Sequence, residues 1–188
     1  RSLLMVTETV TNSEELMEFF TANYVSFLSE GKEFEKRMLL NKLAVFIRDI
    51  HEKGFCHYDL HAGNILIKFN KEQNVTGYDL YLMDLHRVKI FKSVSTNKRI
   101  FNLAQIFNSL SSIMTMSDKF DFIRSYGDSA FGNVTDEKKL VRQIDEQSSK
   151  IRNIHYRSRR KRCLKESSVF SRRMIANLKM FFRKGYDT

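Results

Sequence analysis

The feature that most constrains the fold is a polar loop, residues 57–64, set between a helical repeat and two short apolar strands. Before the loop, five apolar side chains recur at helical spacing up to a helix stop at Gly54: Leu39, Leu43, Phe46, Ile47 and Ile50. After the loop, the period changes to that of strands at residues 64–68 and 81–85, joined through polar residues 70–77. A long helix that leads into a loop and a β-hairpin predicts an α+β domain.

Further helices are predicted on both sides of this unit. Asn12 and Glu15 have the spacing of a capping box, and a helical stripe follows them: Leu16, Phe19, Phe20, Tyr24 and Phe27. Another stripe begins near Lys98, and a short one contains Phe120, Phe122 and Ile123. The 188 residues are 42% hydrophobic and contain no proline and no visible repeat, which predicts a single domain around one core.

Targeting and redox features argue against a secreted or membrane-spanning protein. No apolar run reaches the roughly 18 residues that cross a bilayer, and the first residues do not have the pattern of a signal peptide. The two cysteines, Cys56 and Cys163, match neither a disulfide framework nor metal-ligand spacing, so we expect both to be buried in a protein of a reducing compartment.

The net charge of +10 is concentrated at the C-terminus. Residues 1–150 contain 20 Lys and Arg and 20 Asp and Glu, whereas the last 38 residues contain 12 basic residues and only two acidic ones, Glu166 and Asp187. Apolar side chains recur among these charges at helical spacing: Phe170, Met174, Leu178, Phe181 and Phe182. Residues 156–188 are therefore predicted to form a basic helical tail, which docks on the core, lies on an anionic membrane surface, or does both.

The candidate site consists of three oxygen-bearing side chains. Asp59 and Asn64 lie in the loop, and Asp84 lies on the second strand of the hairpin, so the turn brings all three to one edge. Such hard oxygen ligands suit Mg²⁺ and phosphoryl transfer. The alternatives are an ordinary polar turn, since Asp and Asn favour turns, and a zinc site built on His57 and His61. We expect His57 instead to brace the loop, and His51 and His155 to be surface residues.

These residues resemble the catalytic loop of the protein-kinase-like superfamily, H-x-D-x-x-x-x-N, followed by a metal-binding Asp. By that resemblance Asp59 deprotonates the acceptor hydroxyl, His61 approaches the phosphates or the acceptor, and Asn64 and Asp84 hold Mg²⁺ on ATP. Residues 4–10 resemble the hinge between two lobes. The nucleotide-binding residues that the resemblance implies are Thr7 as gatekeeper, Glu8 and Val10 facing adenine, and Leu66 as the floor of the adenine pocket.

Within the superfamily, residues 84–88, 98–104 and 162–170 resemble the lipopolysaccharide core kinases. That resemblance implies ATP- and Mg²⁺-dependent phosphorylation of Kdo or heptose of the lipid A core, at the cytoplasmic face of the inner membrane of a Gram-negative bacterium. It departs at Asn102, where the family pattern has Asp before Leu-Ala. Basic residues are candidates for binding the anionic glycolipid acceptor: Arg87, Arg159, Arg160 and Arg162. Arg87 is equally suited to a structural ion pair.

No Gly-rich loop and no strand-borne Val-Ala-x-Lys occur in the sequence. We therefore expect a kinase-like C-terminal lobe without its N-terminal lobe, and an enzyme incomplete as a fragment. The expected division is a hinge strand at residues 1–10, a catalytic lobe at 11–155 and the basic tail at 156–188. Two alternatives stay open: another small-molecule or atypical protein kinase, and a degenerate lobe acting as a basic binding module. Nucleic acid is a disfavoured partner, because no RNA-binding motif is present.

Overall fold

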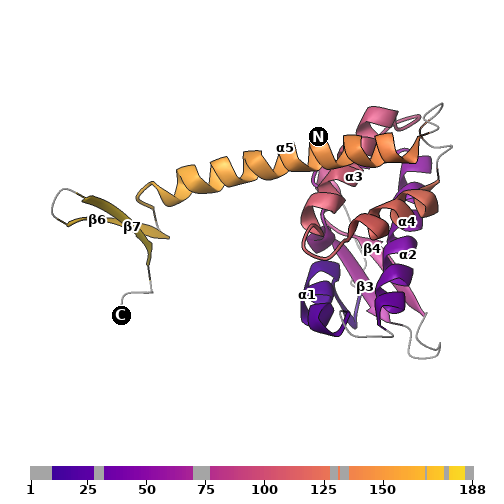
Figure 1. Ribbon diagram of the computed structural model, residues 1–188, viewed down its shortest axis with the longest axis horizontal. Coiled ribbons are helices and arrows are strands. Elements are labelled where there is room, and N and C mark those ends of the chain that lie inside the picture. The colour runs from indigo at the N-terminus through magenta and orange to yellow at the C-terminus, as the bar shows by residue number, and fades with distance from the viewer. Residues whose placement is uncertain are drawn as a thin grey trace, which may run out of the picture.

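The computed structural model describes residues 10–27, 32–69, 77–127, 131, 136–167, 169–175 and 178–184 (Figure 1). Five helices and seven short strands follow one another within these residues. In chain order they are β1 (Ser13–Glu15), α1 (Leu16–Phe27), α2 (Glu33–Glu52), β2 (Phe55–His57), β3 (Ile65–Phe69), β4 (Tyr78–Leu82), β5 (Val88–Ile90), α3 (Thr96–Ser109), α4 (Met116–Tyr126), α5 (Glu137–Cys163), β6 (Phe170–Ile175) and β7 (Leu178–Arg183). Two 3₁₀ turns, η1 (Ala62–Asn64) and η2 (Leu85–Arg87), complete the described elements.

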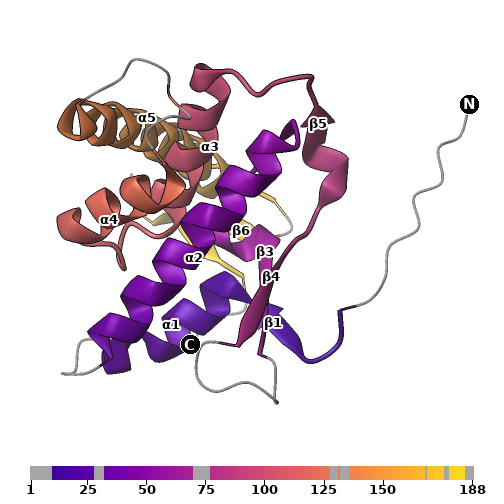
Figure 2. The same ribbon diagram turned by 90° about the vertical axis from the view of Figure 1, so that its right-hand side faces the viewer.

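The core lies between the helices and one face of a small sheet (Figure 2). Helix α2 packs along α4, α3 packs along α5, and α1 lies against β3. Large side chains from each element meet there with almost no exposed surface: Phe20, Leu43, Ile47, Ile67, Leu103, Phe107, Phe122 and Ile144. The mixed helical and strand fold and the single core agree with the prediction from the sequence.

The sheet that carries the loop is antiparallel in the order β1-β3-β4, with Ile65 opposite Leu82 and Phe69 opposite Tyr78. Ile65 and Ile67 point into the core, so Leu66 lies on the other face. A second pair, β2 with β5, joins His57 to Val88. Gly54 ends the long helix as predicted; its φ of +84° and the backbone of Phe91 leave no room for a side chain.

The start of the first helix differs from the prediction. Helix α1 begins at Leu16, and Ser13–Glu15 form β1 instead of a capping box at Asn12. Asn12 has a φ of +56°, which turns the chain so that Glu14 pairs with Ile67 of β3. Pairing of a sheet edge therefore replaces side-chain capping at this position.

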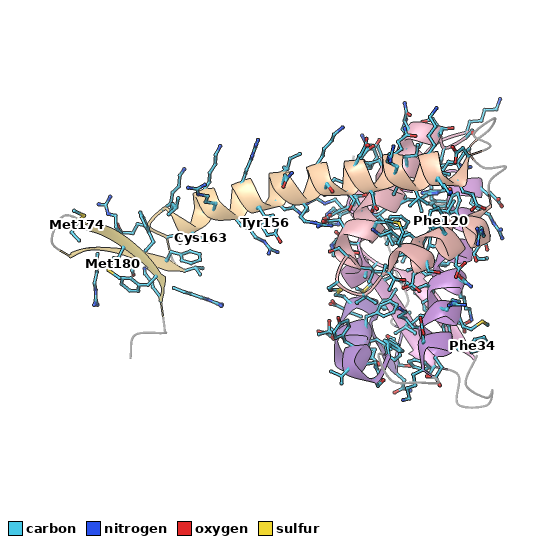
Figure 3. All side chains as sticks on the ribbon, viewed as in Figure 1. Phe34, Phe120, Tyr156, Cys163, Met174 and Met180 are labelled. Atoms are coloured by element: carbon cyan, nitrogen blue, oxygen red, sulfur yellow. The ribbon has the colours of Figure 1, made fainter. Side chains whose placement is uncertain are left out.

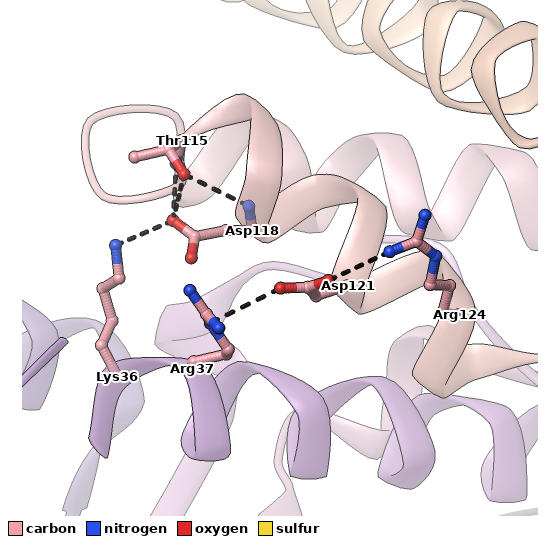
Figure 4. A network of polar contacts seen from close by, with 6 residues as sticks. All are labelled: Lys36, Arg37, Thr115, Asp118, Asp121 and Arg124. Atoms are coloured by element: carbon pink, nitrogen blue, oxygen red, sulfur yellow. Dashed lines mark hydrogen bonds and ion pairs between the residues drawn. The ribbon is translucent and has the colours of Figure 1, made fainter. Parts of the chain in front are cut away.

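A buried ion pair joins α2 to α4 (Figure 4). Asp118 Oδ2 accepts hydrogen bonds from Lys36 Nζ at 2.8 Å, from the Thr115 backbone N–H at 2.7 Å and from Thr115 Oγ1 at 2.8 Å. Burial alone would raise the pKa of the Asp118 carboxyl, but these hydrogen bonds outweigh burial and hold that pKa below 3.8. The Asp118 carboxylate therefore stays ionised at neutral pH.

The last part of the chain stands away from the body (Figures 1 and 3). Leu140, Val141 and Ile144 bury the first half of α5 against the body, whereas the side chains of residues 153–162 are exposed. Helix α5 then leads to the antiparallel hairpin β6–β7. Residues 153–184 are called the arm below.

The arm corrects two predictions. Residues 170–183 form a hairpin and not the predicted amphipathic helix, although residues 156–163 are helical. An apolar helical stripe needs a core to cover it, and among the described residues the core cluster includes none of the arm. The apolar segments of the arm pair as strands instead. Cys56 is buried as expected, but Cys163 is half-buried. None of the described helices is both long and apolar enough to span a bilayer.

Candidate functional site

His57 braces the polar loop, as the sequence predicts. Its Nδ1 accepts a hydrogen bond from the Asp59 backbone N–H at 3.0 Å, and its Nε2 donates to the Met83 carbonyl at 3.2 Å. These partners fix the Nε2–H tautomer. Burial lowers the pKa of His57 below 6.5, so the ring is neutral at pH 7.

Asn64 joins the loop to the segment that carries Asp84. Asn64 Nδ2 donates to the Asp59 carbonyl at 2.8 Å, and the Asn64 carbonyl accepts from the Met83 N–H at 2.9 Å. The Tyr58 N–H donates to the Arg87 carbonyl at 2.9 Å. Asp59, Asn64 and Asp84 therefore lie on two hydrogen-bonded segments. Asp84 does not lie on the second strand as predicted, because β4 ends at Leu82 and Asp84 precedes the turn η2. The convergence of the three side chains at one edge stays a prediction.

Asp84 has an unusual backbone conformation. Its φ of +56° and ψ of +45° are left-handed, a region that non-glycine residues seldom occupy. The carboxylate is 31% exposed, and its Oδ1 contacts His86 Nδ1. A strained backbone at a carboxylate beside the loop is typical of a functional position.

Three side chains of α3 hold the backbone of the loop. Gln105 Oε1 accepts from the Leu60 N–H at 3.2 Å, and Gln105 Nε2 donates to the Tyr58 carbonyl at 3.1 Å. Ser109 Oγ accepts from the Ala62 N–H at 3.1 Å. Gln105, Ser109 and the third residue, Asn102, lie on one helix face and together form a clamp on the loop.

Asn102 contacts both backbone polar groups of His57, its N–H and its carbonyl. Its Oδ1 accepts from the His57 N–H at 3.3 Å, and its Nδ2 donates to the His57 carbonyl and to Gln105 Oε1. A carboxylate could accept the first bond but could not donate the other two. Asn102 departs from the family pattern, but its amide therefore still connects α3 to the loop.

A buried polar chain continues from Asn102 to α4. His51 Nε2 donates to Asn102 Oδ1 at 3.0 Å, and the Tyr126 hydroxyl lies 2.8 Å from His51 Nδ1 and 2.9 Å from Arg99. Burial lowers the pKa of His51 to about 4 and raises that of Tyr126 to about 12. His51 was expected at the surface and is instead fully buried, because its long helix is covered by α3 and α4.

A cleft of about 880 Å³ opens beside the loop, between α1, α3 and α5. Asp59, His61 and Gly63 line its loop side, and Gln105, Asn108 and Ser109 line its α3 side. The α5 wall consists of Ile151, His155, Ser158, Arg159 and Arg162, and the α1 side includes Glu15 and Glu18. Four of the predicted site residues thus face one cleft: Asp59, His61, Arg159 and Arg162.

The other predicted residues lie elsewhere. Arg160 is exposed and is not among the residues that line the cleft, because it follows Arg159 on the outer face of α5. Arg87 is also exposed and pairs with no carboxylate in the described part of the chain. The Val10 carbonyl accepts a hydrogen bond from Ser13 Oγ at 2.9 Å. Thr7 and Glu8 lie outside the described residues.

Some residues at the site were not predicted. Gln105 and Ser109 contact the loop backbone, and the spacing 102, 105, 109 on one helix face was the available signal. His155, expected to be an ordinary surface residue, is exposed but lines the cleft. No spacing rule relates position 155 to the loop, since only the packing of α5 on α3 brings them together.

The donor set near Asp84 fits Mg²⁺ and not zinc. The Asn64 amide is oriented by its bond to the Asp59 carbonyl, which leaves Oδ1 as the atom that can ligate a cation, and the Asn64 carbonyl accepts from the N–H of Met83, the residue before Asp84. Both loop histidines use Nδ1 to accept backbone N–H groups, from Asp59 and Gly63. Nowhere in the described ranges do three His, Cys, Asp or Glu side chains gather as a metal site.

Comparisons with known proteins agree with this fold. A structure of WaaP in complex with acyl carrier protein superposes with a TM-score of 0.62 at 24% identity, over 76% of this chain and 58% of that one. The chain thus shares its fold with WaaP. The model of the Lipopolysaccharide kinase (Kdo/WaaP) family matches residues 1–126, and the chain belongs to that family.

Two curated relatives carry the same description, lipopolysaccharide core heptose(I) kinase WaaP. The Escherichia coli protein is 25% identical over 154 residues, which are 81% of this chain and 57% of the relative. The Pseudomonas aeruginosa protein is 29% identical over 92 residues, 48% of this chain and 34% of the relative. The family predicted from the sequence is confirmed, and the chain spans less than two thirds of either relative.

Proposed function

We propose that the protein transfers a phosphoryl group from ATP to a sugar hydroxyl of the lipopolysaccharide core, of the Kdo or heptose type. The observation that carries the proposal is the cleft. Asp59 faces the cleft, and its backbone N–H and carbonyl are hydrogen-bonded to the side chains of His57 and Asn64. Basic side chains of α5 form the other wall of the cleft. Such a cleft suits an anionic sugar with a hydroxyl directed at a carboxylate. Family membership supports the same activity.

In this proposal Asp59 accepts the proton of the acceptor hydroxyl. The clamp from α3 and the neutral His57 fix the loop, so the carboxylate needs no reorganisation when the acceptor binds. Asn64 Oδ1 and the Asp84 carboxylate would hold Mg²⁺, which neutralises charge on the ATP phosphates. Thr7, Glu8, Val10 and Leu66 would contact the nucleotide, as the family resemblance implies.

The acceptor side of the proposal rests on charge. Arg159 and Arg162 line the cleft, whereas Arg87 and Arg160 are exposed outside it and would at most contact a larger acceptor. Arg guanidinium groups bind carboxylates and phosphates in a bidentate manner. An acceptor screen separates the proposal from another small-molecule or protein kinase, since only the core glycolipid should depend on the α5 arginines.

The test is Asp59→Asn in the full-length protein, with ATP, Mg²⁺ and lipopolysaccharide core as acceptor. Loss of a general base lowers turnover by about 10²–10⁴-fold, while unchanged circular dichroism and melting would show that the fold is kept. Asp79→Asn, on β4 outside the cleft, is the matched control and should retain turnover. Normal turnover of the Asp59→Asn protein would overturn the assignment.

We also infer that the arm contacts an anionic membrane surface, which would hold the enzyme at the cytoplasmic face of the inner membrane. The hairpin exposes Met174 and Met180 beside Arg172 and Arg173, and no Asp or Glu occurs between residues 167 and 184. Exposed apolar and basic side chains together match an anionic lipid interface. A nucleic acid would interact with the basic side chains but would leave the exposed methionines without an apolar partner.

Vesicle sedimentation tests the membrane contact. The chain should bind phosphatidylglycerol vesicles more than phosphatidylcholine vesicles, and Met174→Ser with Met180→Ser should reduce binding about tenfold. Met116→Ser is the matched control, because Met116 in α4 is 56% exposed and Met174 is 57% exposed. Equal loss for the control, or binding indifferent to lipid charge, would contradict the proposal.

A further inference from the structure

A second, smaller cavity of about 230 Å³ lies against the end of α3 and the middle of α5. Its lining is entirely polar or basic, with one aromatic residue: Asn108, Ser109, Ser111, Arg152, His155, Tyr156 and Arg159. Asn108, Ser109, His155 and Arg159 also line the large cleft, so the two cavities adjoin. A group bound in the small cavity would therefore lie beside whatever occupies the cleft.

The α5 residues of the small cavity follow one helical stripe. Positions 152, 155, 156 and 159 follow the three- and four-residue steps of a helix and face the same side of α5. Arg157 and Arg160 lie off this stripe and line neither cavity. The basic run at the end of α5 is thus divided into an inner face and an outer face.

Charge in this small cavity is unbalanced. No Asp or Glu lines it, and no ion pair found among the described residues uses Arg152 or Arg159. Arg152 Nε donates to Asn108 Oδ1 at 3.3 Å, an orientation that turns the Asn108 Nδ2 donor toward other partners. Two guanidinium groups, an imidazole and an amide donor around a small polar cavity form a site for an oxyanion.

We propose that this cavity binds an anionic group, a phosphate or a carboxylate, already carried by the acceptor sugar. The adjoining cleft would then hold the acceptor with a different hydroxyl directed at Asp59. Anchoring a charged group beside the reacting hydroxyl orients the acceptor, which is most of what catalysis of phosphoryl transfer requires. The inference rests on the proposed function and gives its substrate class as a sugar that is anionic before the reaction.

The first experiment measures binding without turnover. Inorganic phosphate is titrated into the chain while the ring signals of His155 are followed by NMR, with acetate as the carboxylate probe and chloride as the reference salt. Saturable shifts with phosphate or acetate, but not with chloride, are expected. Arg152→Gln should weaken the binding at least tenfold, and the matched control Arg157→Gln, on the outer face, should leave it within twofold.

Two outcomes of this titration would overturn the proposal. A shift that never saturates, or is equal in chloride, would indicate general salt screening instead of a site. Equal weakening by Arg157→Gln would indicate that the net charge of the helix, and not the cavity, attracts the anion.

The second experiment uses the full-length enzyme and two acceptors, the anionic sugar and the same sugar after removal of its charged group. Arg152→Gln should raise KM for the anionic acceptor about tenfold or more, leave kcat within threefold, and leave KM for the neutral acceptor unchanged. Equal effects on both acceptors would refute an anion site. Failure of turnover in the unaltered enzyme would instead refute the proposed function, and the phosphate titration would still report on the cavity.

Discussion

The polar loop and the arm use polar residues in opposite ways. In the loop, the backbone groups of Tyr58, Leu60 and Ala62 each have a side-chain partner on α3, and those partners, Gln105 and Ser109, are half-buried. In the arm, residues 153–162 are exposed over more than two turns of helix, and the hairpin exposes Met174 and Met180. Satisfied buried groups fix a geometry, whereas exposed charges and apolar side chains leave free energy available for a partner. The body therefore fixes the loop side of the site, the helical start of the arm supplies the basic wall of the cleft, and the exposed hairpin of the arm is left to contact something outside the chain.

The largest effect is expected when the buried ion pair between Lys36 and Asp118 is broken. Asp118→Asn removes the charge that pairs with Lys36, whose side chain is 8% exposed, and leaves a buried ammonium without its counter-ion. Breaking such a pair costs about 3–5 kcal/mol. Urea unfolding of both proteins at pH 7 measures the free energy of unfolding.

The neighbouring ion pairs supply the control. Asp121→Asn affects pairs with Arg37 and Arg124 that are 3.5 Å long and more exposed, so the loss should stay below about 1 kcal/mol (Figure 4). Similar losses for both variants would show that burial does not decide the strength of these pairs.

The second prediction concerns the connection between α3 and the loop. Asn102→Asp restores the residue of the family pattern but puts a carboxylate against the His57 carbonyl and Gln105 Oε1, where Asn102 now donates. Leaving the buried His57 carbonyl without its Asn102 donor and beside a charge should lower the free energy of unfolding by about 2–3 kcal/mol. Asn108→Asp, in the last turn of α3 and more exposed, is the control. An unchanged or increased free energy of unfolding for Asn102→Asp would show that the amide donors are dispensable.

The sequence predicts what local patterns determine and misses what packing determines. The helical stripe and Gly54 predicted α2 and its end, and the loop pattern put Asp59 and Asn64 directly before β3. Those features depend on neighbours in sequence. The family departure at Asn102 could be seen, but its consequence depends on the peptide unit of His57, 45 residues away.

The misses have one physical origin. His51 is buried because α3 and α4 cover its helix, and His155 reaches the cleft because α5 packs on α3; neither contact leaves a local signal. The hairpin was predicted as a helix because its apolar residues also fit a helical spacing, and only the absence of a core beside the arm decides between the two. Long-range contacts therefore limit the prediction of both the fold and the site.

The third prediction uses the buried polar chain as a pH probe. The pKa of His51 is lowered to about 4 in the folded protein, against 6.5 when exposed, so the unfolded chain binds more protons between these values. Stability should therefore fall as pH decreases from 7 to 5, with about 2 kcal/mol from His51 alone. Urea unfolding at both pH values measures the loss.

His51→Gln isolates this contribution. The variant can still donate to Asn102 but cannot take up a proton, so its loss between pH 7 and pH 5 should be smaller by about 2 kcal/mol. His155→Gln, at an exposed position, should keep the pH dependence of the unaltered protein. Parallel pH dependences for His51→Gln and the unaltered protein would show that His51 is not held neutral.

The smallest effect on the free energy of unfolding is expected when the hairpin of the arm is removed. A chain ending at Leu164 loses the hairpin but keeps Leu140, Val141 and Ile144 in the core. Its free energy of unfolding should change by less than about 0.5 kcal/mol, because two-stranded hairpins contribute little stability by themselves. A chain ending at Lys139 removes those core residues and should unfold. Hydrogen exchange gives an independent reading, since amides of α3 and the loop should be protected far longer than those of β6 and β7. A large loss of stability for the chain ending at Leu164 would mean that the hairpin is part of the folded body, and the membrane proposal would then lose its free surface.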